Sequence, residues 1–201
     1  MGGFCDLDNV TVNGGVLVTG PFGYLKLWNG STVSNGITVN PGGSLAVNAE
    51  FVSGLPTGTT STVNGGINMT NPLNFDFSGG RINGPFTVNP MAANTSTEPT
   101  FCGNTVNGAV TLTDLTTGTI WFGSPEGQPF GIPGDCPGNT INGSLTATRS
   151  GALNMETNTI NGTVQLNHNT ADLGGNTING SLLCDDPAFP PTVLASNTIR
   201  G

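Results

Sequence analysis

Hydrophobic and polar residues alternate in short segments of the chain, and these segments are separated by turn-forming residues such as Asn-Gly. In the segment Thr-Ile-Asn-Gly-Ser-Leu at 140–145, the alternation of a β-strand puts Ile141 and Leu145 on one side and the Thr, Asn and Ser side chains on the other. Val164 and Leu166 repeat this pattern further along. The pattern predicts strands that bury an aliphatic face and expose hydroxyls and amides.

A four-residue unit of Thr, then Val or Ile, then Asn, then Gly recurs along the whole chain with few changes. With its Val or Ile as a marker, the copies are centred on Val12, Val33, Val63, Ile82, Val106, Ile141, Ile160, Ile178 and Ile199. The intervals are 21, 30, 19, 24, 35, 19, 18 and 21 residues, so most are close to twenty. A repeat of this length without helical periodicity is typical of a parallel β-solenoid, in which each repeat forms one coil. We therefore expect Ile141, Ile160 and Ile178 to stack in one file inside a rod.

The two longest intervals contain turn-rich segments, Leu-Pro-Thr-Gly at 55–58 and Ser-Pro-Glu-Gly-Gln-Pro at 124–129. We expect the chain to leave the coil there. Within the repeat, the glycine indicates a tight bend or a close backbone approach, and the Asn-Gly pair predicts corners with positive φ.

A β-sandwich with hairpin turns at Asn-Gly is the alternative fold. The sequence fits it less well, because sandwich turns recur every 8 to 12 residues or so and rarely with one repeated unit. The prediction is an all-β fold, a single-domain parallel β-solenoid (β-helix) over residues 1–201. We expect coils of about 18–24 residues and one or two longer, loop-bearing coils.

Composition narrows the range of partners. The chain has 32 Gly and 14 Pro, and 35% of its residues are hydrophobic, which is more than a disordered linker contains. Four Lys and Arg against 12 Asp and Glu give a net charge of -8, so no basic surface is available for nucleic acid. No segment is long and apolar enough to predict a membrane span.

The C-terminal segment Asn-Thr-Ile-Asn-Gly-Ser-Leu-Leu-Cys at 176–184, a Pro-containing loop, and Asn-Thr-Ile-Arg-Gly at 197–201 carry a resemblance. They resemble the end of a group of secreted, mostly uncharacterised actinobacterial repeat proteins, in which a second Asn-Thr-Val-x-Gly unit precedes a closing Cys. The resemblance is specific from Asn139 onward and implies an extracellular β-solenoid without a particular activity. This sequence departs from the pattern at Gly201, so Cys184 lacks its expected partner.

The four cysteines show no zinc or redox spacing. Cys102 and Cys136 lie four and five residues before the markers of consecutive repeats, which puts them nearly above each other on one long coil. We predict a disulfide between Cys102 and Cys136, as fits an oxidising compartment.

Cys5 and Cys184 are expected near opposite ends of the rod, too far apart to pair within one molecule. One interpretation is that both are free, or that Cys184 has lost its partner. The other joins residues 197–201 of one copy to residues 1–5 of a second, which recreates the closing sequence of the resembled group. It predicts head-to-tail stacking by strand addition, with an intersubunit disulfide between Cys184 and Cys5.

Groups for catalysis are few. We expect the single histidine, His168, to face solvent. Pectin-cleaving β-helices offer an enzymatic comparison, for which the candidates are Asp185, Asp186, Asp172, Glu156 and Arg149. A solvated turn before Pro187 explains the Asp pair better. Asp6 and Asp8 are too few to hold Ca²⁺. The expectation is a protein without enzyme activity, metal or cofactor.

Outward ladders offer a binding surface instead. One file is expected to contain Thr140, Thr159, Thr177 and Thr198, and a second Asn142, Asn161 and Asn179. Thr files suit ice binding, although this file is single and interrupted at Arg81. Mixed files suit polysaccharide, with aromatic platforms at Tyr24, Trp28, Trp121 or Phe122. Such residues also serve as plain solvent-side strand residues.

The sequence as a whole favours an extracellular structural or adhesive solenoid, a subunit of a head-to-tail filament at the cell surface. A polysaccharide-binding or polysaccharide-cleaving β-helix is the first alternative, and an ice-binding protein is the second.

Overall fold

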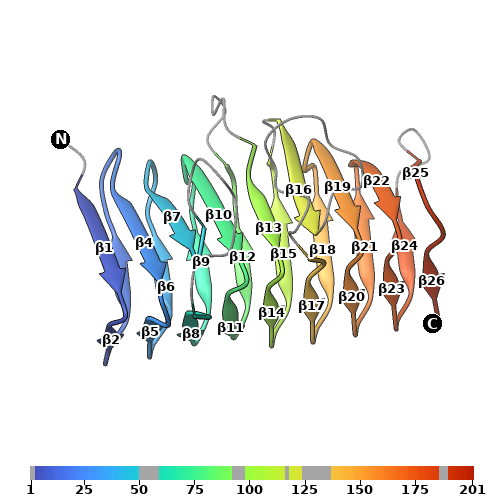
Figure 1. The fold of residues 1–201 in the computed structure, drawn as a ribbon. Coiled ribbons are helices and arrows are strands. Elements are labelled where there is room, and N and C mark those ends of the chain that lie inside the picture. Colours follow the sequence, from blue (N-terminus) through green and yellow to red (C-terminus); the bar gives the residue numbers. More distant parts are fainter. Residues whose placement is uncertain (1–2, 50–58, 92–97, 116–117, 124–136, 186–189) are drawn as a thin grey trace.

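The computed structural model describes residues 3–49, 59–91, 98–115, 118–123, 137–185 and 190–201. Over these ranges the chain contains short strands, turns and no helix. It winds into eight complete coils of three strands and two strands of a ninth coil, all within the described part. The coils lie side by side as a rod with the N-terminus at one end and the C-terminus at the other (Figure 1).

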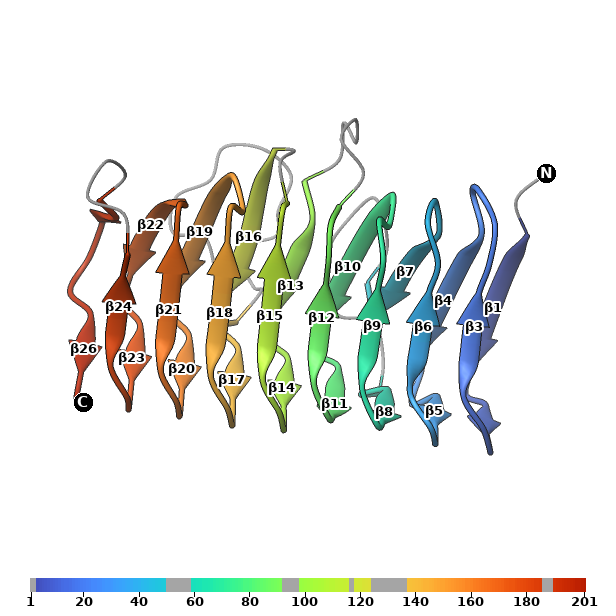
Figure 2. The same cartoon turned by 180° about the vertical axis from the view of Figure 1, so that it is seen from behind.

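Each complete coil contributes one strand to each of three sheets, here called sheets A, B and C, and the ninth coil contributes strands to sheets A and B. Sheet A contains β1 (Phe4–Asp8), β4 (Tyr24–Trp28), β7 (Ser44–Val47), β10 (Asn74–Ser78), β13 (Thr100–Cys102), β16 (Thr119–Gly123), β19 (Ala152–Glu156), β22 (Thr170–Gly174) and β25 (Thr192–Val193). Sheet B contains β2 (Thr11–Val12), β5 (Thr32–Val33), β8 (Thr62–Asn64), β11 (Arg81–Asn83), β14 (Thr105–Val106), β17 (Thr140–Ile141), β20 (Thr159–Ile160), β23 (Thr177–Ile178) and β26 (Thr198–Ile199). Sheet C contains β3 (Val16–Val18), β6 (Ile37–Val39), β9 (Ile67–Met69), β12 (Phe86–Val88), β15 (Val110–Thr113), β18 (Leu145–Thr148), β21 (Val164–Asn167) and β24 (Leu182–Cys184). Figure 2 shows sheet C from its outer side, with β26 beyond β24 at the C-terminal end.

The strand register confirms the predicted parallel β-solenoid. Ile141 pairs with Ile160 and Ile160 with Ile178 in parallel ladders. All three side chains are at most 1% exposed, so they form the predicted buried file. The long intervals of the repeat contain the two turn-rich segments, 55–58 and 124–129, which lie outside the described residues.

The core consists of side chains that point inward from all three sheets. Aliphatic residues fill it toward both ends, and phenylalanines fill it in the middle. Phe101 stacks on Phe122 with ring centroids 5.0 Å apart, and Phe86 packs on Phe101 at 4.8 Å. Continuous burial from coil to coil supplies the hydrophobic stabilisation of the rod.

The glycine of the repeat is needed for space. A Cβ built on Gly162 would lie 2.6 Å from the carbonyl oxygen of Gly143, one coil earlier. This confirms the predicted close backbone approach. The predicted positive φ at the Asn-Gly pairs of the repeat, in the corner between sheets B and C, is confirmed at Gly36 and Gly65, with φ of 79° and 89°, and is wrong for Gly143 and Gly162. The left-handed residues lie mainly at the other two corners, for example Asn29 between sheets A and B and His168 between sheets C and A.

Candidate functional site

The outward Thr side chains of sheet B stack in one file. The register pairs Thr140 with Thr159, Thr159 with Thr177 and Thr177 with Thr198. Arg81 interrupts the file between coils that both carry Thr. The file therefore presents hydroxyls at the spacing of parallel strands, roughly 4.8 Å, along the second half of the rod.

Asn142, Asn161 and Asn179 form a second file, and their side chains bond to one another. The Nδ2 group of Asn161 donates to Oδ1 of Asn142 at 2.8 Å, and Nδ2 of Asn179 donates to Oδ1 of Asn161 at 2.7 Å. At the C-terminal end, the Nη1 group of Arg200 donates to Oδ1 of Asn179 at 3.2 Å. These amides use part of their hydrogen-bonding capacity within the rod, which favours a stabilising role for the file.

A further ladder of asparagines runs inside the corner between sheets A and B. Each member precedes the Thr of its repeat unit, and the members are Asn104, Asn139, Asn158, Asn176 and Asn197. The backbone N–H and the Nδ2 group of each one donate to Oδ1 of the next one along the chain, at 2.9 to 3.1 Å. Sequence reasoning missed this buried asparagine ladder. The signal was the recurrent Asn before Thr in the last five units.

The acidic residues considered for catalysis do not converge. Glu156 and Asp172 lie in β19 and β22 of sheet A, whereas Asp185 follows β24 in sheet C. Asp186 lies outside the described residues. Over the described ranges, no three His, Cys, Asp or Glu side chains are grouped as a metal site requires.

Arg149 forms an ion pair away from these acids. Its Nε group lies 2.6 Å from Oδ1 of Asp114, and its Nη2 group lies 3.0 Å from Oδ2. The hydrogen bonds from Arg149 lower the pKa of Asp114. His168 is exposed at its corner, as predicted. Arg149 and His168 are thus exposed, whereas Glu156 is buried, at 4% exposure.

The outward face of sheet A contains a buried carboxylate, Asp76, which is 8% exposed. Thr100 donates to its Oδ1 atom from the backbone N–H at 3.2 Å and from the hydroxyl at 2.5 Å, and Asn74 Nδ2 donates to Oδ2 at 2.8 Å. Burial raises the pKa of Asp76, while these hydrogen bonds oppose the shift. Burial also raises the pKa of Tyr24, and the nearby carboxylates Asp76 and Asp6 add to this effect. The Oδ1 atom of Asn74 is buried without a hydrogen-bond partner.

The aromatic residues proposed as sugar platforms are mostly covered. Phe122 is 1% exposed in the core, and Trp121 is 8% exposed. Trp28 is half-buried beneath the ammonium group of Lys26, which lies 4.1 Å from the ring centroid. This arrangement gives no flat exposed aromatic surface at Trp121 or Phe122.

Exposed large hydrophobic side chains of the described residues gather at the two ends of the rod. At the N-terminal end they are Phe4, Val10, Leu17 and Phe22. At the C-terminal end they are Leu183, Val193, Leu194 and Ile199. Val193 is 66% exposed although its neighbour one coil earlier, Leu173, is only 2% exposed. Val193 and Ile199 thus occupy inward positions that the preceding coil buries, whereas Leu17 and Leu183 lie on the outer side of sheet C, where they pair with Thr38 and Gln165.

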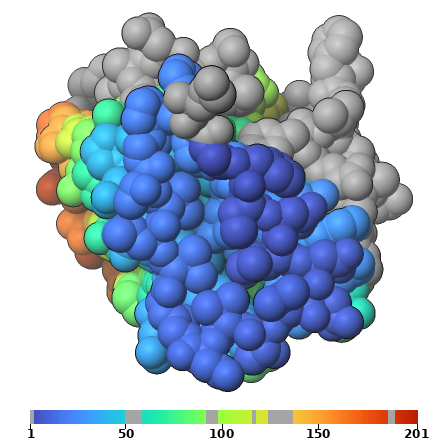
Figure 3. Space-filling view, turned by 90° about the vertical axis from the view of Figure 1, so that its left-hand side faces the viewer, coloured from blue at the N-terminus to red at the C-terminus, as the bar shows by residue number. Residues whose placement is uncertain are grey.

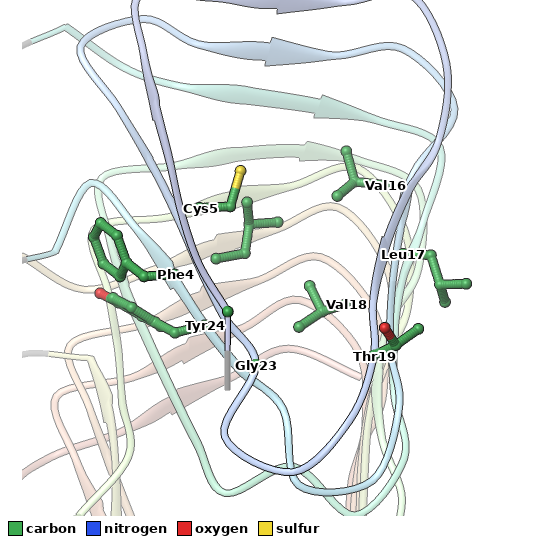
Figure 4. A pocket seen from close by; sticks show the side chains of 10 residues that line it. Phe4, Cys5, Val16, Leu17, Val18, Thr19, Gly23 and Tyr24 are labelled. Carbon is green, nitrogen blue, oxygen red and sulfur yellow. The ribbon is translucent and has the colours of Figure 1, made fainter. Parts of the chain in front are cut away.

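Figure 3 shows the face of the N-terminal end coil, and Figure 4 shows a hollow at this end. Cys5 and Val18 border this hollow of about 250 Å³ from opposite sheets, with Phe4 beside Tyr24 at its rim. Leu17 points away from it, on the outer side of sheet C. The hollow is the open end of the core.

Two free thiols lie at opposite ends. Cys5 pairs with Leu25 in sheet A and Cys184 pairs with Leu166 in sheet C, so both occupy inward-facing positions of end strands. Burial raises the pKa of the Cys184 thiol. If residues 197–201 of one copy and residues 1–5 of the next formed the closing sequence of the resembled group, Cys5 would lie in a strand that continues sheet C. In the structure Cys5 lies in β1, which pairs with β4 in sheet A.

Cys102 is the last residue of β13 and is 2% exposed. Cys136 lies outside the described residues, so the Cys102–Cys136 disulfide stays a prediction.

No helix in the described ranges has the length and apolar character that a membrane span requires. Comparisons with protein families, with curated proteins and with solved structures found no match for the chain.

Proposed function

We propose that this protein is a structural solenoid whose rods associate head to tail into a filament. The C-terminal coil of one copy stacks on the N-terminal coil of the next copy. The observation that carries the proposal is that Val193 and Ile199 are exposed on the last coil, although their neighbours one coil earlier, Leu173 and Ile178, are buried in the core.

The end strands have matching free edges. In the strand order of the described residues, β2 is at one edge of sheet B and β26 at the other, and both run in the same direction. Thr198 donates its N–H to the carbonyl of Asn176, one coil earlier, at 2.8 Å. By the same pattern, Thr11 of the next copy donates to Asn197. Stacked copies thereby extend the parallel ladder across the junction.

The inward files also continue across the junction. Val193 follows the file that begins with Leu7, and Ile199 follows the file that begins with Val12. A copy stacked on β25 and β26 places Leu7 over Val193 and Val12 over Ile199. Covering each half-exposed side chain contributes about 1 kcal/mol, so a few such contacts give reversible association.

The junction is noncovalent in this register. The ninth coil has no described strand in sheet C, so the stack leaves a space one strand wide between β24 and the next β3. Cys184 and Cys5 border this space from opposite sheets. Along the rod axis the two cysteines lie more than one coil apart, ~6 Å, and across the rod they are separated by the width of the core. The two separations together exceed the Cα–Cα distance of roughly 6.8 Å that a disulfide spans.

Charge permits close approach of the copies. Only 8% of the residues are charged, although the net charge is -8. Added salt screens the remaining repulsion, and the proposal therefore includes association that strengthens with ionic strength.

An extracellular, cell-surface location is part of the proposal. It is supported by the resemblance from Asn139 onward and by the predicted disulfide between Cys102 and Cys136. Detection of the native protein in the medium or on intact cells supports it, and recovery in the cytosol contradicts it.

Sedimentation velocity over a range of concentrations tests the self-association. We expect the average sedimentation coefficient of the wild type to rise with concentration. Val193→Lys puts a charge on the C-terminal face and should remove the rise. Thr146→Lys puts the same charge on the outer side of sheet C and should behave as the wild type. A wild type that stays monomeric, or an equal loss in both variants, would overturn the proposal.

A further inference from the structure

We infer that the junction between copies reuses the coil-to-coil contacts of the repeat, and that Gly14 and Val10 set how tightly it closes. The inference rests on the proposed head-to-tail stacking and specifies its register.

Repeat glycines pack backbone on backbone along the rod. A Cβ on Gly180 would lie 2.6 Å from the carbonyl oxygen of Gly162, and a Cβ on Gly201 would lie 2.5 Å from the carbonyl carbon of Gly180. In each case the added atom projects toward the N-terminal end of the rod. Gly14 holds the same place in the first coil, and nothing lies within 4 Å of its Cβ position.

At Gly14, therefore, a substitution can affect stacking between copies without affecting the folding of a single rod. Within a single rod, the space beside Gly14 is open. In a stack of the proposed register, Gly201 of the preceding copy occupies that space. A methyl group at residue 14 is therefore harmless to the rod and obstructs the junction.

The buried asparagine ladder supplies the second contact. The backbone N–H of Asn176 donates to Oδ1 of Asn197 at 3.0 Å. In a stack of the proposed register, Val10 of the next copy lies over Asn197. Its own N–H donates to Ser31 Oγ at 3.1 Å, within its own rod, but its side chain offers no acceptor to a preceding copy.

Val10 thus interrupts the ladder at the junction. An asparagine at residue 10 would place Oδ1 over the N–H of Asn197. Its Nδ2 group would face the carbonyl of Val193, as Nδ2 of Asn197 donates to the carbonyl of Leu173 at 3.2 Å. The natural junction consequently lacks the asparagine contacts that join the coils from Asn104 to Asn197, which makes the junctions points where a filament separates.

Three variants test the inference: Gly14→Ala, Val10→Asn and the apolar control Val10→Leu. Sedimentation equilibrium gives the dissociation constant of each, and thermal unfolding at a concentration that keeps the rods monomeric checks the fold. We expect Gly14→Ala to keep the wild-type unfolding midpoint and to raise the dissociation constant at least tenfold. Val10→Asn should lower it about tenfold, as one or two added hydrogen bonds would, and Val10→Leu should match the wild type.

The outcomes distinguish this inference from the proposed function. A wild type that associates while Gly14→Ala and Val10→Asn leave its dissociation constant unchanged overturns the register and leaves self-association standing. A wild type that does not associate overturns both.

Discussion

Asn158 donates its backbone N–H and its side-chain Nδ2 to the same atom, Oδ1 of Asn176, one coil further along the rod. The Nδ2 group also donates to the carbonyl of Phe122 at 2.8 Å, on the opposite side. Each buried asparagine therefore links three consecutive coils. These amides hold the corner between sheets A and B together, because buried polar groups are stable only when they are hydrogen-bonded.

Replacing Asn158 by Ala should lower the free energy of unfolding by about 2–4 kcal/mol. The change removes the acceptor of two hydrogen bonds from Asn139 and the donor to Phe122. Chemical denaturation measures the loss.

Asn161→Ala is the matched control, since this residue sits three positions later on the exposed asparagine file. It should change the free energy of unfolding by ~0.5 kcal/mol or less. Equal losses of unfolding free energy in Asn158→Ala and Asn161→Ala would show that the buried ladder stabilises the rod no more than the exposed asparagine file does.

Asp76→Asn should stabilise the protein at pH 7 by about 1 kcal/mol. The folded state raises the pKa of Asp76 above its unfolded value, so the wild type binds this proton more tightly when folded. The stabilisation linked to it is complete below pH ~4 and is lost as the pH rises through the folded pKa. The NH2 group of the variant takes the place of the Oδ2 atom that accepts from Asn74 Nδ2, so the Asn74 amide must turn over, and its Oδ1 atom, which has no partner in the wild type, then accepts this hydrogen bond.

Thermal or urea unfolding from pH 3 to pH 8 checks this account of Asp76. The two proteins should converge near pH 4 and separate at higher pH. A variant less stable than the wild type at neutral pH would mean that the carboxylate is needed in its charged form.

Gly162→Ala should destabilise the rod by ~2–3 kcal/mol, because its methyl group overlaps the backbone of Gly143. Gly14→Ala carries the same substitution at the open position of the first coil and should leave the unfolding midpoint of the monomer unchanged. Differential scanning calorimetry at low protein concentration compares them. A stable Gly162→Ala protein would show that the corner has more room than the glycine contacts indicate.

The coil was predictable because stacking forces each coil to repeat the residue type of the coil beneath it. Ile141, Ile160 and Ile178 reveal the coil through their spacing alone. The buried asparagine ladder was not predictable in the same way. Strand alternation assigns a side only within a strand, and Asn158 lies at a corner, where the turn decides the direction of its side chain.

The burial of an outward side chain also could not be predicted from the sequence. Strand alternation predicts that Trp121 lies on the outer side of sheet A and Phe122 on the inner side, but it does not predict that Trp121 is buried on the outer side. The position of Cys5 likewise depended on which sheet the first strand joins.

Electron microscopy of the wild type under conditions that favour association tests head-to-tail stacking most directly. The account predicts unbranched filaments of the width of one rod, with an axial repeat per copy of about 43 Å, nine coils at roughly 4.8 Å each. Isolated short rods at every concentration, or rods joined along their flanks, would contradict it.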